Sequence, residues 1–254
     1  MDPLLRVDNI SKHFAGLKAV QSVSFHLEKG SITGLIGPNG AGKTTCFNMI
    51  SGVYQPTMGE IFFKGKRSDG LPPHSMAALG IGRTFQIVRP LSSLTVLENI
   101  IAALGIRSYR KFFARWRSFR SRSSGSSAME ILKRVDLSNR AASKAGLLPL
   151  GELRRLEIAR ALALEPELLL LDESFSGLRH EEIDRLSELV RSIRDGGTGI
   201  LLIEHNMKVA MSLSSNVVVL DHGVKIAEGS PLTVQKDTAV IEAYLGKAGV
   251  ENAS

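Results

Sequence analysis

The chain of 254 residues is long enough to bury a sizeable core, and its 43% apolar and 22% charged residues are typical of a soluble globular protein. Its apolar runs fall short of the roughly 18 residues needed to span a bilayer, and its first residues lack the pattern of a signal peptide. The single cysteine, Cys46, allows no disulfide within the chain, which fits a reducing compartment.

The net charge of +7 is concentrated in one interval. No acidic residue lies between Glu98 and Glu130, and the basic residues there equal the excess of the whole chain. They are Arg107, Arg110, Lys111, Arg115, Arg117, Arg120 and Arg122. Because the positive charge is local, it gives little support for a general nucleic-acid binder.

Alternating and apolar runs predict the elements in chain order. Two alternating runs over residues 4–29 predict antiparallel strands. Residues 31–37 predict a buried strand that leads into a glycine-rich turn and a helix from about Gly42. A strand is then expected at 59–65, a helix at 95–105 that ends on Gly105, and a flexible linker at 121–127.

The second half of the chain alternates helices with strands. Helices are expected at 128–137 and 151–164, an apolar strand at 167–172, a helix at 180–195, a strand at 199–204, a helix at 206–214, and strands at 216–221 and 224–229. A continuous apolar strand is typical of a parallel sheet covered on both faces. The pattern predicts an α/β fold with helical material inserted between about residues 90 and 160.

The segment GPNGAGKTT matches the phosphate-binding pattern G-x-x-x-x-G-K-[ST], with the required strand before it and helix after it. Glycines let successive backbone N–H groups surround phosphate oxygens, and the helix N-terminus adds a favourable dipole. Lys43 is expected at the β- and γ-phosphates, and the Thr44 hydroxyl at Mg²⁺. The alternative is a chance glycine-rich turn. The predicted nucleotide-binding residues are Gly37, Pro38, Asn39, Gly40, Ala41, Gly42, Lys43, Thr44 and Thr45.

An acidic pair, Asp172 and Glu173, ends the apolar strand at 167–172. A carboxylate at the C-terminal end of such a strand is placed beside a phosphate loop in parallel sheets. Asp172 is expected to hold Mg²⁺ directly or through water, and Glu173 to polarise the attacking water as general base. The alternative is an acidic pair that simply caps a buried strand.

Along nearly its whole length the chain resembles the ATPase subunit of ATP-binding cassette (ABC) transporters. GPNGAGKTT matches the family's phosphate loop and LLLLDE its Mg²⁺ strand. By this resemblance Gln86, in GRTFQ, is the Q-loop glutamine, and His205, in LLIEHNM, is the switch histidine that contacts the γ-phosphate. Phe14 falls on the aromatic that stacks on adenine, with core packing as the alternative. The resemblance implies ATP and Mg²⁺ as cofactors, Glu173, His205 and Gln86 as catalytic residues, and Thr44, Gln86 and Asp172 as metal ligands.

The segment LPLGE falls on the family signature L-S-G-G-Q, which faces the ATP held by a second subunit. Leu148 and Gly151 agree with it, whereas Pro149 stands for Ser, Leu150 for Gly and Glu152 for Gln. Pro149 has neither a hydroxyl nor an N–H to offer a phosphate, and one lost bond to a charged group is worth roughly 1.5–3 kcal/mol. Two further departures follow the catalytic Glu: Ser174 replaces the common Pro, and Arg179 the common Asp. We hypothesise a different ATPase as partner, with two unequal composite sites.

Within the family, residues 80–100, 201–231 and 240–246 resemble most the ATPases of bacterial branched-chain amino acid importers. The resemblance implies one ABC ATPase domain over residues 1–254. Its parts would be a P-loop NTPase core with an N-terminal antiparallel β subdomain (about 1–90 and 160–254) and an inserted helical subdomain (about 90–160). The implied partners are a second ABC ATPase subunit, two transmembrane permeases and, indirectly, a secreted solute-binding protein. The implied location is the cytoplasmic face of the inner membrane.

Other functions stay open within the same resemblance. The chain is also compatible with a lipopolysaccharide-export ATPase, with a soluble ABC ATPase of translation or DNA repair, and with a nucleotide-binding subunit of little activity. The basic segment at 107–122 carries aromatics at helical spacing among its cations. It is read as a surface helix whose aromatics pack inward, or as an interfacial helix that touches anionic lipid or the membrane subunits.

Overall fold

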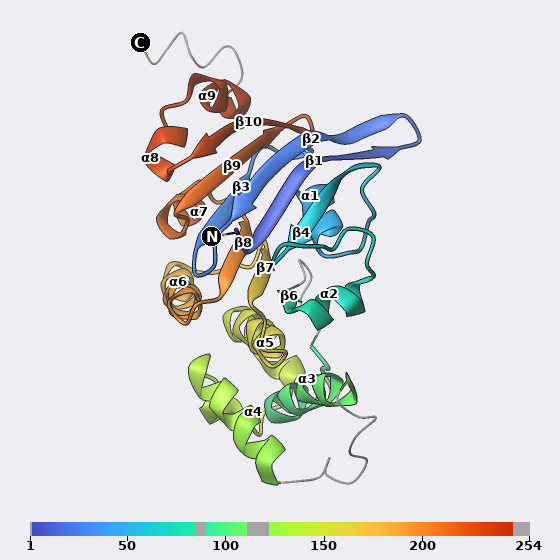
Figure 1. Cartoon of the computed structure of the whole chain (residues 1–254). Coiled ribbons are helices and arrows are strands. Elements are labelled where there is room, and N and C mark those ends of the chain that lie inside the picture. Colours follow the sequence, from blue (N-terminus) through green and yellow to red (C-terminus); the bar gives the residue numbers. More distant parts are fainter. Residues whose placement is uncertain (1, 85–89, 111–121, 246–254) are drawn as a thin grey trace.

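A computed structural model describes residues 2–84, 90–110 and 122–245. Its strands form two sheets (Figure 1). The smaller sheet has the order β2-β1-β4-β5, and its paired strands all run antiparallel. It is built from β1 (Leu5–Phe14), β2 (Leu17–Leu27), β4 (Met58–Phe63) and β5 (Lys66–Arg67). The two antiparallel strands predicted over residues 4–29 are therefore confirmed.

The larger sheet has the order β10-β9-β3-β8-β7-β6, and all its neighbouring strands are parallel except the β10–β9 hairpin. Its strands are β3 (Ile32–Ile36), β6 (Ile81–Arg83), β7 (Leu168–Asp172), β8 (Gly199–Ile203), β9 (Asn216–Asp221) and β10 (Val224–Gly229). Every residue of β3, β7 and β8 is buried, which explains why their sequences are continuously apolar.

The helices lie around this sheet, and α3, α4 and α5 gather at the end opposite α8 and α9 (Figure 1). They are α1 (Lys43–Ile50), α2 (Pro73–Leu79), α3 (Val96–Arg110), α4 (Arg122–Arg134), α5 (Leu150–Leu162), α6 (His180–Asp195), α7 (Met207–Leu213), α8 (Pro231–Val234) and α9 (Thr238–Leu245). One core joins the smaller sheet to α1 and one face of the larger sheet, and a second joins the other face to α3–α7. These elements confirm the α/β fold class; the subdomain boundaries near residues 90 and 160 stay predictions.

Two local predictions are wrong. Residues 122–127, expected to be a flexible linker, belong to α4, whose Ala128 and Leu132 are buried against the helical core. Serine and glycine are poor helix formers, but burial of an apolar face outweighs their propensity. The helix expected to end at Gly105 continues to Arg110. A glycine ends a helix only when its backbone turns left-handed, and Gly105 is not among the glycines with positive φ.

The register of the parallel strands aligns their carboxyl ends. Leu35 of β3 lies opposite Ile203 of β8, and Ile203 lies opposite Asp172 of β7. The residues that follow these strands, 37, 173 and 204, therefore emerge at one edge of the sheet. Ligands bind at the carboxyl ends of the strands in parallel sheets, so this edge is the expected position of a functional site.

Candidate functional site

The glycine-rich loop leaves β3 in a shape that only glycine allows. Gly37 has φ 148°, and a side chain on it would collide with the carbonyl oxygen of Leu220. Gly42 has φ 96°, and a Cβ there would lie 2.5 Å from the carbonyl oxygen of Ala19. Within the predicted loop 37–45, these two glycines therefore pack directly against neighbouring backbone. This packing determines the conformation of the chain that leads into α1.

The N-terminus of α1 is open to an anion. The helix begins at Lys43, without a side-chain cap and without an acidic residue in its first turn. Its first N–H groups have no partner within the helix, so they and the helix dipole favour a negative ligand. Residues 40–45, with residues 17–19 and His222, line a hollow of about 330 Å³. The predicted residues Thr44 and Thr45 thus lie beside space that a ligand can enter.

Lys43 is folded back onto the loop. Its Nζ donates to the carbonyl oxygens of Gly37 and Pro38, both at 2.8 Å. Burial lowers the pKa of Lys43, and the nearby carboxylates of Glu173 and Asp172 offset only part of this effect. The ammonium is held by two neutral carbonyls, so a phosphate at the loop would offer it a stronger, charge-assisted partner.

Phe14 lies at the surface, at the end of β1, and not in the core. Its side chain stays 39% exposed and meets Tyr54 edge to face, with the ring centroids 5.3 Å apart. Lys12 lies over both rings, and its Nζ donates to the carbonyl of Gln55 at 2.8 Å. This exposed aromatic pair can stack on a base. Tyr54 escaped the sequence analysis because it lies 40 positions from Phe14.

Asp172 is buried at the end of β7, as predicted, and a cation faces it. Nη2 of Arg83 lies 3.7 Å from its Oδ2. Burial raises the pKa of Asp172, and the charge of Arg83 is the main influence that lowers it. The sequence analysis did not single out Arg83, which ends the short strand β6 next to β7. Its signal was a lone Arg at the end of a buried strand segment.

Glu173 and His205 come together at the same edge. Oε2 of Glu173 lies 3.9 Å from Nδ1 of His205, and the imidazole is half exposed. The backbone of Glu173 has φ 47°, a left-handed conformation that is uncommon for residues other than glycine. Its N–H donates to the carbonyl oxygen of Ile203 at 2.9 Å. A carboxylate held this way can accept a proton from a neighbouring water.

The predicted residue Gln86 lies outside the described residues, but the last residue before this gap contacts the Asp172–Glu173 segment. Oγ1 of Thr84 accepts from the N–H of Asp172 at 3.3 Å and lies 3.3 Å from Oγ of Ser174. Ser174 is buried. The serine that replaces the family's proline therefore contributes a hydroxyl contact between β6 and the residue after Glu173.

Glu204, which the sequence analysis missed, is fully buried between Ile203 and His205. Its Oε1 accepts from the N–H of Phe175 at 3.0 Å. The pKa of Glu204 is raised to about 7, mainly by burial and also by the charge of Glu173, against the lowering influence of the Phe175 N–H and Arg154. A Glu at the end of an otherwise apolar strand was the available signal. This carboxyl links the loop after Glu173 to the loop that holds His205.

The predicted signature residues do not form one open surface. Leu148 is buried in the helical core, and Glu152 pairs with Arg140 at 3.1 Å. Gly151 is buried too, and a side chain on it would collide with the carboxylate of Glu182 in α6. Pro149 stands at the N-cap of α5 and supplies no side-chain cap. The small size of Gly151 thus accommodates a carboxylate of the same chain.

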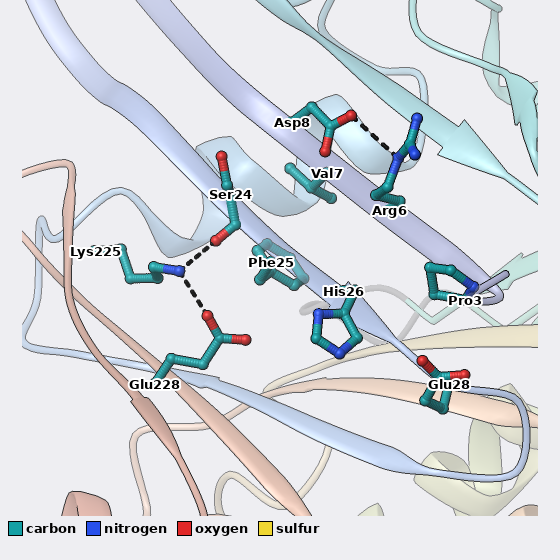
Figure 2. Close-up of a pocket in the computed structure, with 10 residues that line it drawn as sticks. All are labelled: Pro3, Arg6, Val7, Asp8, Ser24, Phe25, His26, Glu28, Lys225 and Glu228. Atoms are coloured by element: carbon teal, nitrogen blue, oxygen red, sulfur yellow. Dashed lines mark hydrogen bonds and ion pairs between the residues drawn. The ribbon is translucent and has the colours of Figure 1, made fainter. Parts of the chain in front are cut away.

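A larger groove of about 560 Å³ lies elsewhere, on β1, β2 and β10 (Figure 2). Its charged side chains are largely paired with one another. Arg6 lies 3.1 Å from Asp8, and Nζ of Lys225 lies 2.6 Å both from Glu228 and from the carbonyl oxygen of Ser24. Since these partners satisfy one another, the groove presents few polar groups to a ligand, and the smaller hollow at the loop is the better candidate.

The described residues contain no cluster of three or more His, Cys, Asp or Glu residues arranged to hold a metal ion. In the same residues no helix has the length and apolar character required to cross a bilayer. The predicted aromatic residues between positions 111 and 121 lie outside the described part, so the two interpretations of the basic segment stay predictions.

Gly37→Ala is expected to destabilise the protein more than Gly40→Ala. Both residues have positive φ, but a side chain at Gly40 meets nothing within 4 Å. Gly40→Ala should therefore cost only backbone strain of about 1–2 kcal/mol, and Gly37→Ala at least about 3 kcal/mol because its neighbour is backbone. Urea unfolding of the two variants measures the difference. Equal losses would contradict the steric account.

Glu204 is expected to make stability fall as the pH rises from about 4.5 to 7. Its folded pKa is raised to about 7 from the usual 4.5, so the unfolded chain gives up this proton first. The free energy of unfolding should decline by up to about 3 kcal/mol more in the wild type than in Glu204→Gln. Glu188→Gln, at an exposed position of α6, is the control. Parallel curves for wild type and Glu204→Gln would refute this assignment.

Comparison with known proteins places the chain among transporter ATPases. A family model described as "ABC transporter" matches residues 20–176, and one described as "Branched-chain amino acid ATP-binding cassette transporter" matches residues 224–250. The chain is 41% identical over 252 residues to the high-affinity branched-chain amino acid transport ATP-binding proteins BraF of Pseudomonas aeruginosa and LivG of Escherichia coli. Each match covers 97% of this chain and 99% of the relative.

Two further comparisons agree. The lipopolysaccharide export system ATP-binding protein LptB of Haemophilus influenzae is 33% identical over 244 residues, covering 96% of this chain and 98% of LptB. Among solved structures, an ATP-binding cassette of an ABC transporter in its ADP conformation aligns with TM-score 0.86 and 32% identity, covering 97% of this chain and 100% of that one. With the family match over residues 20–176, these similarities show that the chain belongs to the ABC transporter family, as an ATP-hydrolysing subunit.

Proposed function

We propose that the protein powers the import of branched-chain amino acids, or of a related solute, by ATP hydrolysis. The observation that carries the proposal is the convergence of the phosphate loop, Asp172, Glu173 and His205 at one edge of the sheet. The solute follows from the relatives: BraF and LivG are more similar in sequence than LptB. Lipopolysaccharide export and a soluble, non-transport role are therefore the weaker alternatives.

ATP would bind with its base at Phe14 and its phosphates at residues 37–45. The exposed Phe14–Tyr54 pair offers an aromatic face, and the loop is followed by the uncapped N-terminus of α1. Lys43 would exchange the carbonyls of Gly37 and Pro38 for phosphate oxygens. This exchange keeps the ammonium hydrogen-bonded while it gains a charged partner.

The residues present fit a magnesium ion held jointly with the nucleotide. Mg²⁺ is usually bound through one or two carboxylates, with phosphates and waters completing its shell. Asp172 supplies such a carboxylate, and Thr44 lines the hollow at the loop; Gln86 is the third predicted ligand. When bound, the ion would neutralise charge on the phosphates. Thr44 and Asp172 would hold the phosphates and their metal next to Lys43.

Glu173 is the proposed general base. Its carboxylate would accept a proton from the attacking water, and His205, 3.9 Å away, would contact the γ-phosphate and keep that water in line. The left-handed backbone of Glu173 supports this role, because such strain is found mostly where a side chain must be held in one direction.

The proposed assembly follows the family. A second ABC ATPase, two membrane permeases and a secreted solute-binding protein would complete the importer at the cytoplasmic face of the inner membrane. The chain would act as one ATPase domain over residues 1–254, with its helical subdomain at about 90–160.

The signature of this chain is proposed to serve its partner's ATP poorly. Pro149 offers no hydroxyl or N–H, and the carboxylate of Glu182 lies beside Gly151 in the first turn of α5. The helix N-terminus attracts anions, and the carboxylate of Glu182 already neutralises part of this attraction, so less remains for a phosphate. The site that uses Lys43 and Glu173 of this chain would therefore be the faster of two unequal sites in a heterodimer.

Glu173→Gln should lower the ATP hydrolysis rate by about 10²–10⁴-fold and leave ATP binding nearly unchanged, because the amide cannot accept the proton. Steady-state phosphate release and equilibrium nucleotide binding measure the two effects. Glu188→Gln, on the exposed side of α6, should hydrolyse ATP as the wild type does. A loss of less than about tenfold in Glu173→Gln would rule out this base.

The unequal-site hypothesis is tested in the assembled transporter. Glu173→Gln in this chain should remove most of the turnover, whereas the matching Gln variant of the partner ATPase should remove little. Equal losses would contradict the hypothesis. If instead the wild-type assembly shows no hydrolysis above its double Gln variant, the chain is a nucleotide-binding subunit of little activity.

A further inference from the structure

Arg83 is anchored to the helix that follows the phosphate loop. Its Nη1 donates to Oγ of Ser51, the C-cap of α1, at 2.7 Å. Its guanidinium carbon lies 4.7 Å from the centroid of the Phe47 ring, a cation–π distance. These contacts hold a permanently charged group at the end of β6 from the side of α1, independently of the carboxylate that it faces.

The carboxylate that Arg83 faces is Asp172. Nη2 lies 3.7 Å from Oδ2, and the Asp172 side chain is 3% exposed. A carboxylate buried this far is stable only with a counter-charge. Among the cations of the described residues that lower the pKa of Asp172, Arg83 has the largest influence, ahead of Arg154 and Lys43. Arg83 is therefore the main counter-ion of Asp172.

The separation of 3.7 Å is longer than a charge-assisted hydrogen bond of about 2.7–2.9 Å. Arg83 can therefore lose the attraction of Asp172 and keep its bond to Ser51 and its contact with Phe47. Under the proposed function, on which this inference rests, the same carboxylate binds Mg²⁺. Two cations that neutralise one carboxylate oppose each other's binding, because each gains less from a carboxylate already paired.

We propose that Arg83 is a positioning residue that stands in for Mg²⁺ at Asp172. Without the metal, Arg83 faces the Asp172 carboxylate and holds it in place. With the metal bound, the guanidinium stays on Ser51 and Phe47, and its repulsion of the ion limits the Mg²⁺ affinity of the site. A purely structural Arg83 would instead stabilise the protein equally with and without metal.

The test uses the full chain with ADP, so that no hydrolysis intervenes. Arg83→Met removes the charge and keeps a long apolar side chain over Phe47. Relative to wild type, its melting temperature should fall clearly with ADP and EDTA, and by less than half as much with ADP and Mg²⁺. The Mg²⁺ affinity of the ADP complex should rise at least about threefold.

Arg155→Met is the matched control. Arg155 is also a buried arginine with an ion pair, 2.9 Å from Asp136, but it lies away from the loop. Its loss should lower the melting temperature equally in both conditions. Arg83→Lys, which keeps the charge, should keep the Mg²⁺ affinity within about twofold of wild type. If Arg83→Met does not fold, Arg83→Gln gives the same comparison.

The outcomes separate this inference from the proposed function. If Arg83→Met loses the same stability with and without Mg²⁺ and its Mg²⁺ affinity does not rise, Arg83 is merely structural and the inference is overturned. If the ADP complex of the wild type shows no Mg²⁺ response, or if Asp172→Asn responds as the wild type does, the metal role proposed for Asp172 fails first.

Discussion

The alignment of three parallel strand ends is the constraint on which the site depends. Hydrogen bonds between β3, β8 and β7 bring Gly37, Glu204 and Glu173 to one edge, although they lie far apart in the sequence. The strands can be parallel because both faces are covered, one by the smaller sheet with α1 and the other by α3–α7, so that β3, β7 and β8 are completely buried. The apolar residues of these strands therefore support function indirectly, because they fix the strand register. A shift of the register by one residue would move the phosphate loop away from the carboxylates of Glu173 and Glu204.

The edge gathers charges that burial would otherwise penalise. The positive charges of Lys43 and Arg83 oppose the negative charges of Asp172 and Glu173. Glu204 has a pKa raised to about 7, which lowers the free-energy cost of burying its carboxyl group. Three of these groups also have a neutral hydrogen-bond partner: carbonyls accept from Lys43, a hydroxyl accepts from Arg83, and a backbone N–H donates to Glu204. A site balanced in this way is prepared for a polyanion with its metal, because incoming charges replace existing partners.

The sequence predicted the loop and the Asp172–Glu173 pair because short-range pattern fixes both: glycine spacing, and an apolar strand that ends in acids. It did not reveal Arg83, Tyr54 or Glu204, whose partners come from distant segments and whose roles depend on burial. The same limitation explains why the linker predicted at 121–127 is wrong over residues 122–127, where packing of α4 outweighed poor helix formers. Gly151 matched the signature, but the pattern could not show that it makes room for Glu182 of the same chain.

A crystal structure of the protein with ADP and Mg²⁺ tests most directly whether this edge of the sheet is the ATP site. We expect the diphosphate at the N-terminus of α1, Nζ of Lys43 moved from the carbonyls of Gly37 and Pro38 to phosphate oxygens, and the carboxylate of Asp172 facing the metal. A nucleotide bound elsewhere, with Lys43 still on those carbonyls, would contradict this expectation.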